Sequence, residues 1–247
     1  MILSRFKKAG ARKPLLPEGV RIYAIGDVHG RADLLKACFK KIDEHLADDP
    51  AVRPLQITVG DYVDRGPSSK GVLDLLWERS QRYEMIMIRG NHEQTLMEFM
   101  SDPASLENWA RIGGLETLMS YGLRPALSPS LEQQKELAAA LQVAMPIPHR
   151  MLLTTMLPSF SCGGYFFTHA GVRPGVQLSQ QSEHDLMWIR DEFLLCEEPF
   201  ERIIVHGHTP VRMVDVRPNR INIDTGAYAT GRLSCMVFQA GEADLLT

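Results

Sequence analysis

Metal-binding residue types recur in this chain at the ends of short apolar segments. Each of five such segments stops at a Gly or a His, and an Asp, Asn or His follows within a few residues. They read IYAIGDVHG (22–30), LQITVGDYVDRG (55–66), MIMIRGNHE (85–93), YFFTHAG (165–171) and IIVHGHTP (203–210). Any single histidine among them would be read as structural. Five such segments, spread over most of the chain, predict side chains gathered around one centre at the edge of a sheet.

The candidate ligands are two carboxylates, one amide and three imidazoles. Asp27 and His29 are two positions apart, so in an extended segment both side chains point to the same side. Asp61 follows the second segment, and the later segments are followed by Asn91, His169 and His208. Six ligands suit two ions that share a carboxylate, and Asp61 is the best placed to be shared. Oxygen and imidazole donors without thiolate favour Mn, Fe or Zn over a structural zinc site.

Strand-like and helix-like segments alternate in the first half of the chain. The pattern predicts strands at 21–26, 55–59 and 84–89 and helices at Asp33–Leu46, at Ser68–Arg82 and from His92 or Glu93 onward. A β-α-β-α-β order predicts a parallel sheet with helical crossovers. Ligands of such sheets bind beyond the carboxyl ends of the strands, which is where the Asp, His and Asn residues fall.

Residues 101–150 interrupt this alternation with mostly helical sequence, at Leu115–Tyr121 and Leu131–Met145. Such an insertion could form a cap that shapes the substrate site, or it could simply cover one face of the sheet. Strands are then predicted at 164–168, 202–206, 211–216, 220–224 and 233–238, with one helix around 182–195 among them. These strands predict a second, mixed or antiparallel sheet.

Composition excludes several functional classes. A chain of 247 residues can form one large domain, and its net charge of −3 disfavours nucleic-acid binding. No segment is long and apolar enough to predict a membrane span. The cysteines are far apart and favour buried thiols in a reducing compartment, hence a cytoplasmic protein; they are Cys38, Cys162, Cys196 and Cys235.

The basic N-terminus has no apolar stretch after its charges, so it does not predict a signal peptide. Residues 1–19 are expected to form a disordered tail, with a membrane-binding or partner-binding arm as the alternative. Residues 20–247 are expected to form one catalytic domain that includes the helical insertion at about 101–150.

The motifs GDVHG, GDYVDRG, GNHE, HAG and GHTP resemble those of the phosphoprotein-phosphatase-type (calcineurin-like) metallophosphoesterases, most closely those of bacterial serine/threonine protein phosphatases. The resemblance runs from about residue 20 to 238. It implies an α/β fold of four layers, α/β/β/α, with two mixed sheets around a dinuclear centre, most often of Mn. It assigns Asp27, His29 and Asp61 to the first ion. The second ion shares Asp61 and adds Asn91, His169 and His208.

Two departures from related families refine this assignment. Related phosphodiesterases often end the last motif in Gly-His-x-His, whereas Pro210 stands at the final position here. This favours the phosphatase branch and His208 as the ligand, with His206 as a structural or outer histidine. The SAPNYC loop of eukaryotic phosphatases has no counterpart, and INIDTGA (221–227) occupies its region, as in bacterial relatives.

The resemblance also implies the chemistry. A hydroxide bridging the two ions attacks phosphorus directly, Arg65 and Arg190 bind the phosphoryl oxygens, and His92 protonates the leaving alkoxide while Asp64 orients it. The expected substrates are phosphoserine and phosphothreonine in proteins or peptides. Non-catalytic roles are the alternatives: Arg65 could bind a loop carboxylate, and Asp64 could cap a helix. Arg190 in MWIRDEF, the least specific match, could pair with its acidic neighbours.

Three rival functions remain open. Close relatives with the same metal centre hydrolyse dinucleoside polyphosphates, and symmetrical hydrolysis of diadenosine tetraphosphate is the main alternative. These relatives often lack the Asp of VDRG and carry GNHD, whereas this chain has Asp64 and GNHE, which favours phosphomonoesters. Small phosphoesters and nucleotides are further alternative substrates. A non-catalytic scaffold should have gaps among the ligands, and the sequence has none. A DNA end-processing nuclease is disfavoured by the missing GHxH histidine and by the acidic net charge.

Overall fold

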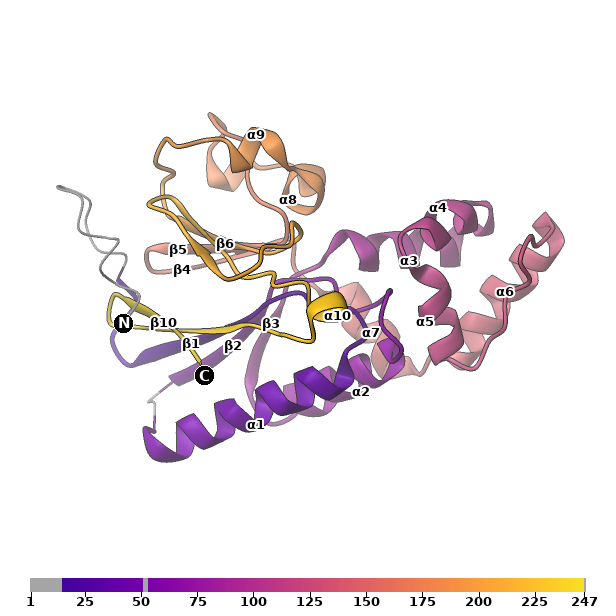
Figure 1. The fold of residues 1–247 in the computed structure, drawn as a ribbon, viewed down its shortest axis with the longest axis horizontal. Helices are drawn as coiled ribbons and strands as arrows, with labels where there is room; N and C mark the ends of the chain where they lie inside the picture. The colour runs from indigo at the N-terminus through magenta and orange to yellow at the C-terminus, as the bar shows by residue number, and fades with distance from the viewer. Residues whose placement is uncertain (1–14, 51–52, 247) are drawn as a thin grey trace.

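Two five-stranded sheets pack face to face between two layers of helices (Figure 1). The computed structural model describes residues 15–50 and 53–246. Helices α1 (Ala32–Asp48) and α2 (Ser69–Ser80) cover the outer face of the first sheet. Helices α8 (Glu183–Trp188) and α9 (Asp191–Leu194) cover the outer face of the second sheet. The predicted α/β/β/α sandwich with two mixed sheets is confirmed.

The first sheet has the order β10-β9-β1-β2-β3. Its strands β1 (Val20–Ile25), β2 (Arg53–Thr58) and β3 (Glu84–Met87) are parallel, as the sequence predicts. Strand β9 (Cys235–Gln239) pairs antiparallel with β1, and β10 (Glu242–Leu245) pairs antiparallel with β9. The expectation that the strand near 233–238 belongs to the second sheet is therefore wrong. Its Met236 and Phe238 instead extend the apolar inner face of the first sheet.

The second sheet has the order β4-β5-β6-β8-β7 and is mixed. Strands β5 (Tyr165–Thr168), β6 (Ile203–His206) and β8 (Arg220–Asn222) are parallel, and β4 (Ser159–Cys162) and β7 (Asp215–Val216) are antiparallel to their neighbours. The strand predicted at 211–216 is reduced to the two residues of β7. Met213 is largely exposed within the rest of that segment, so little apolar burial holds it against the sheet.

The central strand β1 is buried on both faces, which explains its nearly continuous apolar sequence. Ile22 and Ala24 point into the core between the two sheets. Tyr23 and Ile25 point the other way, into the core formed with α1 and α2. Alternate residues of β1 therefore belong to the two apolar cores on either side of the first sheet.

The helical insertion begins with α3 (Asn91–Ser101) and ends with α7 (Ile147–Thr155). It stands beyond the carboxyl ends of β1, β2 and β3 (Figure 1). Between the two helices lie a short 3-10 turn (Pro103–Ser105), α4 (Leu106–Arg111), α5 (Gly114–Ser120) and α6 (Leu131–Ala144).

The single helix predicted around 182–195 is wrong, because the chain forms two short helices there. Arg190 separates α8 from α9 with a non-helical backbone, at φ −131° and ψ −101°. Ile189 is extended and buried in the core under these helices. The apolar periodicity continues across this interruption, so the sequence pattern alone does not reveal it.

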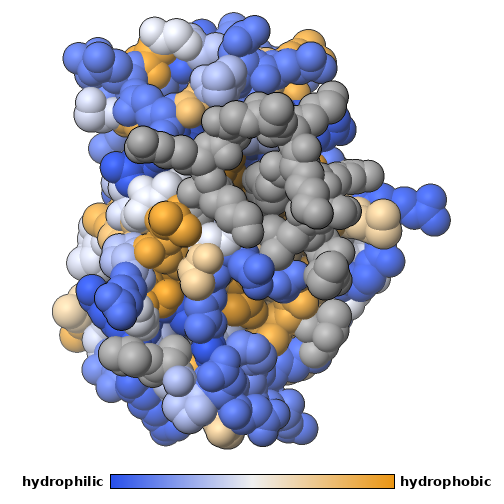
Figure 2. All heavy atoms as spheres, turned by 90° about the vertical axis from the view of Figure 1, so that its left-hand side faces the viewer, coloured by the Kyte–Doolittle hydropathy of each residue, from blue (hydrophilic) through white to orange (hydrophobic). Residues whose placement is uncertain are grey.

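Most of the predicted N-terminal tail, residues 1–14, lies outside the described residues. Within the remainder, the Leu15 carbonyl accepts a hydrogen bond from Gly164 N, and Leu16 is buried. Figure 2 shows this end of the molecule, where hydrophilic residues predominate among the coloured atoms. None of the helices that the structure describes combines the length and apolar character required to cross a bilayer.

Candidate metal centre

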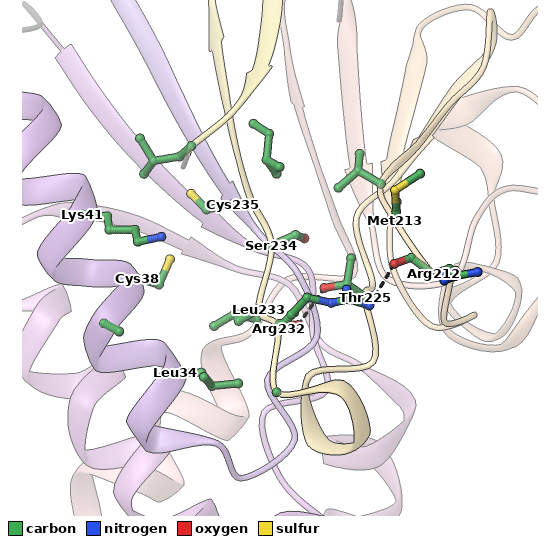
Figure 3. A pocket seen from close by; sticks show the side chains of 15 residues that line it. Leu34, Cys38, Lys41, Arg212, Met213, Thr225, Arg232, Leu233, Ser234 and Cys235 are labelled. Atoms are coloured by element: carbon green, nitrogen blue, oxygen red, sulfur yellow. Dashed lines mark hydrogen bonds between the residues drawn. The ribbon is translucent and has the colours of Figure 1, made fainter.

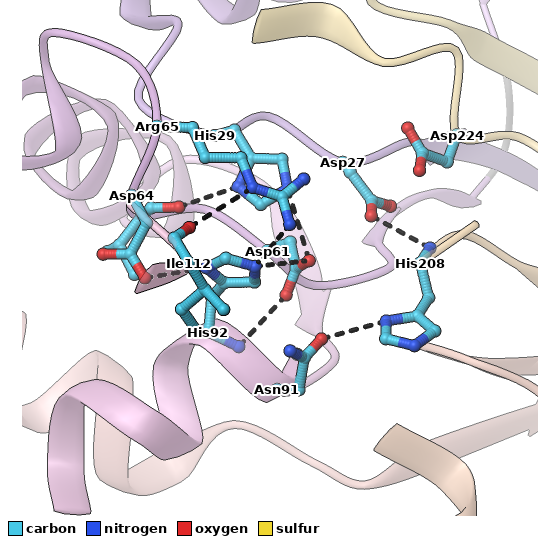
Figure 4. A network of polar contacts seen from close by, with 12 residues as sticks. Asp27, His29, Asp61, Asp64, Arg65, Asn91, His92, Ile112, His208 and Asp224 are labelled. Carbon is cyan, nitrogen blue, oxygen red and sulfur yellow. Dashed lines mark hydrogen bonds and ion pairs between the residues drawn. The ribbon is translucent and has the colours of Figure 1, made fainter. Parts of the chain in front are cut away.

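Left-handed backbone marks the turns that carry the predicted ligands. Six non-glycine residues in the described part of the chain have a positive φ: His29, Asp61, Asp64, Arg65, His208 and Ala240. The first five are all predicted site residues. Such conformations are unfavourable for residues with a Cβ and persist where the surrounding structure fixes them, often at functional sites. The strand ends therefore turn sharply, and these turns direct the side chains into one centre (Figure 4).

Three predicted ligands converge on one point between the two sheets. His169 Nε2 and His208 Nδ1 are 3.1 Å apart, and each lies 2.9 Å from Asn91 Oδ1. His169 Nδ1 lies 2.9 Å from the Val59 carbonyl, so Nδ1 carries the proton and Nε2 keeps its lone pair. Lone pairs of His169 and Asn91 thus face each other at hydrogen-bond distance. A cation bound between them would remove the repulsion between these two acceptors.

Asp61 extends one carboxylate oxygen toward each half of the centre. Its Oδ1 lies 3.3 Å from His169 Nε2, and its Oδ2 lies 3.3 Å from His29 Nε2. His29 Nδ1 lies 2.9 Å from the Val63 carbonyl, which again assigns the ring proton and leaves Nε2 as an acceptor. This is the geometry expected of a carboxylate that bridges two ions.

Asp27 supplies a second buried carboxylate beside Asp61. Its Oδ2 accepts a hydrogen bond of 2.9 Å from His208 N, while its buried Oδ1 has no hydrogen-bond partner among the described residues. Burial, with the charges of Asp224 and Asp61, raises the pKa of Asp27 well above its ordinary range. An unpartnered buried carboxylate oxygen is costly unless a cation neutralises it, so the residues present fit a metal centre.

Glu93 holds the turn that presents Asp61. Its carboxylate accepts hydrogen bonds from the backbone N–H groups of Asp61, Tyr62, Val63 and Gly90, at 2.8–3.1 Å. Burial and the nearby Asp61 raise the pKa of Glu93 to about 8, although the backbone donors act in the opposite direction. Glu93 was not among the predicted site residues. Its signal was the GNHE motif, whose acid lies in the first turn of α3.

His92 lies between Asp64 and Arg65. Its Nδ1 is 2.7 Å from Asp64 Oδ2, and Arg65 Nη2 lies 3.0 Å from its Nε2. His92 Nε2 is also 3.8 Å from Asp61 Oδ2, so the ring borders the metal ligands. Burial lowers the pKa of His92, but the carboxylates of Asp61 and Asp64 outweigh it and raise the pKa above its ordinary value.

The helical insertion supplies residues that fix Asp64. Trp109 Nε1 donates to Asp64 Oδ2 at 2.9 Å, and Thr117 Oγ1 donates to Asp64 Oδ1 at 2.6 Å. Arg65 N donates to the Gly113 carbonyl at 3.0 Å. Helices α4 and α5 therefore buttress the site, besides covering the end of the sheet. Trp109 and Thr117 were not among the predicted site residues, because no short motif marks them.

Arg190 stands at the opposite end of the ligand row from Arg65. Its Nη1 donates to Thr209 Oγ1 at 3.1 Å, and its charge contributes to lowering the pKa of the adjacent His208, which burial chiefly lowers to about 2. Its acidic neighbour Glu192 pairs with Arg173 instead. His206 points away from the centre and packs edge-on against Phe193 under α9, at 4.9 Å between ring centroids.

A separate cavity of about 450 Å³ lies between α1 and the 212–235 segment (Figure 3). Leucines and the buried thiols of Cys38 and Cys235 line much of it, and it contains none of the predicted metal ligands. The described cysteines are all free, but only these two are buried; Cys162 and Cys196 are partly exposed. The ligand cluster, with its convergent polar atoms, is the reaction site suggested by the structure.

The profile of the calcineurin-like phosphoesterases matches residues 20–245. The chain belongs to this family of metallophosphoesterase hydrolases, which use a dinuclear metal centre. Two groups of buried side chains bring candidate ligand atoms within 4.8 Å of one another: one is His29, Asp61 and His92, and the other is Asp61, His169 and His208.

Similarity to individual proteins extends over most of the chain in one case and over a smaller part of it in another. It is 26% identical over 232 residues to an asymmetrical bis(5'-nucleosyl)-tetraphosphatase PrpE of Bacillus thuringiensis (strain Al Hakam), covering 86% of this chain and 88% of the relative. It is 35% identical over 96 residues to serine/threonine-protein phosphatase 1 of Salmonella typhimurium, covering 38% of each.

Solved structures share the fold. A putative diadenosine tetraphosphatase superposes with a TM-score of 0.65 at 19% identity, over 94% of this chain and 95% of the other. The cold-active protein-tyrosine phosphatase of a psychrophilic Shewanella superposes with a TM-score of 0.57 at 14% identity, over 96% and 85%.

Proposed function

We propose that this protein is a phosphatase that hydrolyses phosphomonoesters, with phosphoserine and phosphothreonine in proteins as its principal substrates. The observation that carries the proposal is the contact chain from Asp64 through His92 to the edge of the Asp61 carboxylate. A buried imidazole held by a buried carboxylate is suited to moving a proton. An alkoxide leaving group requires such a proton, whereas a phosphate leaving group needs it much less.

The proposed ligands divide around Asp61, whose two oxygens face His29 and His169. Asp27, His29 and Asp61 would hold one divalent ion, and Asp61, Asn91, His169 and His208 the other, with Mn preferred over Fe or Zn. When bound, the pair supplies charge neutralisation at the phosphoryl oxygens and an activated water. Asp61 aligns both halves because its two oxygens face different histidines.

Arg65 and Arg190 act as phosphate clamps in this proposal. They lie at opposite ends of the ligand row, so their guanidinium groups can bind different non-bridging oxygens. Arg65 contacts His92 Nε2 in the free protein. Moving this guanidinium onto the phosphate frees Nε2 to take up a proton from water, which the imidazolium can then deliver to the leaving oxygen. Asp64 retains the other ring nitrogen, and Trp109 and Thr117 keep Asp64 in place.

Hydrolysis of dinucleoside polyphosphates is the second candidate. The similarity to tetraphosphatases, which covers 86% of this chain, favours it. The retained Asp64 and its three side-chain contacts favour phosphomonoesters, because this machinery has little use with a phosphate leaving group.

The free thiols support a reducing, cytoplasmic location.

A substrate panel tests the proposal. Chelated enzyme is reconstituted with Mn, Fe or Zn, and a phosphoserine peptide is compared with diadenosine tetraphosphate at matched concentration. A kcat/KM at least about tenfold higher for the phosphopeptide supports the phosphatase assignment. The reverse preference establishes the second candidate, and inactivity with every metal and substrate contradicts both.

A further inference from the structure

Two partly exposed aromatic side chains flank the candidate metal centre, and the chemistry proposed above uses neither. Tyr228 is 39% exposed and Trp188 is 38% exposed. Each contacts a different candidate ligand: Tyr228 lies edge-on to His29 at 5.3 Å between ring centroids, and Trp188 lies edge-on to His208 at 6.4 Å. A phosphoester bound across the two halves of the centre therefore has an aromatic surface at each end.

The segment that carries Tyr228 is held firmly. Helix α10 (Ala227–Thr230) lies between Gly226 and Gly231, both in left-handed conformations at φ +64° and +70°. Arg31 Nη1 donates to the Ala227 carbonyl at 3.0 Å, and Gly226 N donates to Asp224 Oδ1 at 2.8 Å. The ring is thus positioned by backbone contacts that do not involve its own hydroxyl.

Arg65 links this ring to the phosphate site. Its Cζ lies 4.9 Å from the Tyr228 ring centroid, within the range of a cation–π contact. The guanidinium proposed to bind phosphate therefore also lies on the aromatic ring, so a planar group near the scissile phosphate would meet Tyr228. At the other end, the exposed His184 lies nearly parallel to Trp188, at 6.4 Å between ring centroids and 22° between planes.

We propose that Tyr228 and Trp188 are specificity-determining residues that select substrates with an aromatic ring close to the scissile phosphate. Exposed faces of Tyr and Trp bind flat rings by stacking, and Arg65 can share such a ring. The ring can belong to a nucleobase or to an aromatic side chain beside a phosphorylated residue. The inference rests on phosphoester hydrolysis at this metal centre, but not on whether the natural substrate is a protein.

Matched substrate pairs test this selectivity without changing the leaving group. The first pair is adenosine 5'-monophosphate and ribose 5-phosphate. The second is a phosphoserine peptide with Trp next to the phosphoserine and the same peptide with Ala there. The ratio of kcat/KM within each pair reports the aromatic preference. A preference confined to the first pair identifies a nucleobase as the ring. A preference confined to the second pair identifies a peptide side chain.

In at least one pair, the ring-bearing substrate should be favoured by about 5- to 100-fold, the range that stacking of one base provides. Tyr228→Leu and Trp188→Leu should each move this ratio toward one, mainly through KM. Tyr228→Phe keeps the ring and should retain the ratio. Ratios near one in the wild-type enzyme for both pairs, or ratios unchanged in both Leu variants, would overturn the proposal.

A binding measurement separates this inference from the proposed function. A phosphonate analogue of adenosine 5'-monophosphate, which cannot be hydrolysed, should quench tryptophan fluorescence of the zinc-loaded enzyme, whereas ribose 5-phosphate should not. Trp188→Phe should lose the quenching, because Trp109 is fully buried and Trp77 is half-buried on α2. If the enzyme is inactive on every phosphoester, the proposed function fails, and this titration alone decides whether the aromatic site exists. Quenching that depends on Trp188 supports the site, and absence of quenching rejects it.

Discussion

At the residue scale, the positions of the ring protons decide what each histidine of the site can do. His29 and His169 each direct one ring nitrogen to a backbone carbonyl, at 2.9 Å, and the other nitrogen toward Asp61. The carbonyls thereby fix both tautomers and leave acceptor atoms facing a carboxylate. His92 differs because its Nδ1 faces the carboxylate of Asp64. Rings of one chemical type are thus prepared either to bind a cation or to transfer a proton.

His92→Asn should separate these two roles. With a phosphoserine peptide, kcat should fall by about 10²- to 10⁴-fold, the typical contribution of a positioned general acid. With 4-nitrophenyl phosphate, whose leaving group needs little protonation, the loss should stay below about tenfold. Steady-state kinetics on enzyme with verified metal content provide the measurement. Equal losses on both substrates would be incompatible with His92 as the acid.

At the scale of the elements, the strand ends bring the ligands together, and glycines allow the close approach. A Cβ on Gly90 would lie 2.2 Å from Asp61 Oδ1, although the backbone of Gly90 itself is unstrained at φ −90°. A Cβ on Gly207 would lie 1.9 Å from Asp27 Oδ1. These glycines are therefore required by the space that the carboxylates occupy.

Gly90→Ala should displace Asp61 and weaken metal binding by about tenfold or more, with a loss of about 1–3 kcal/mol in stability from overpacking. Metal titration and urea unfolding measure the two effects. Gly175→Ala is the matched control: its added Cβ meets nothing within 4 Å, but its φ of +78° imposes backbone strain. It should lose stability and keep its metal affinity. Normal metal binding by Gly90→Ala would show that the turn adapts.

The insertion is anchored to α2 by a buried histidine away from the metal centre. His149 Nε2 lies 2.9 Å from Asp74 Oδ1, and its Nδ1 lies 2.7 Å from Tyr121 Oη. Burial lowers the pKa of His149 below its ordinary value of 6.5, aided by Lys70, and Asp74 offsets this only in part. The unfolded chain therefore binds this proton at a higher pH than the native protein.

Stability should accordingly fall as the pH drops below about 6.5 toward the lower native pKa of His149, and be fully present above that value. His149→Gln should reduce this slope and cost about 1–3 kcal/mol at neutral pH, because the buried Tyr121 hydroxyl loses a hydrogen bond. Urea unfolding between pH 5 and 7.5 measures both effects. The exposed His184→Gln is the control. A slope in His149→Gln identical to the wild type would eliminate this histidine as the source.

At the scale of the whole molecule, the centre joins the two sheets. Asp27 and Asp61 follow strands of the first sheet, whereas His169 and His208 follow strands of the second. Bound cations would thus link the two sheets across the sandwich and neutralise its buried carboxylates. Metal binding is therefore expected to contribute to the stability of the entire domain.

Chelation should lower the thermal unfolding midpoint by about 5–10 °C relative to enzyme with Mn at a hundredfold excess over Kd, a difference of about 2.7 kcal/mol for one site. Differential scanning calorimetry provides the measurement. Asp61→Asn, which removes the shared ligand, should show little response to Mn, whereas the exposed Asp33→Asn should respond as the wild type does. A midpoint independent of Mn in the wild-type protein would contradict a structural linkage by metal.

The sequence by itself determined the family, the parallel β1-β2-β3 core and the residue types of the metal centre. These features are local: apolar runs form buried strands, and the polar residue after each run lies at the strand end. Only the tertiary structure decided that β9 joins the first sheet, that α8 and α9 are separate, and that Trp109, Thr117, Tyr228 and Trp188 border the site. Those contacts join residues distant in the chain, and their energies depend on packing between elements, which no periodicity or short motif encodes.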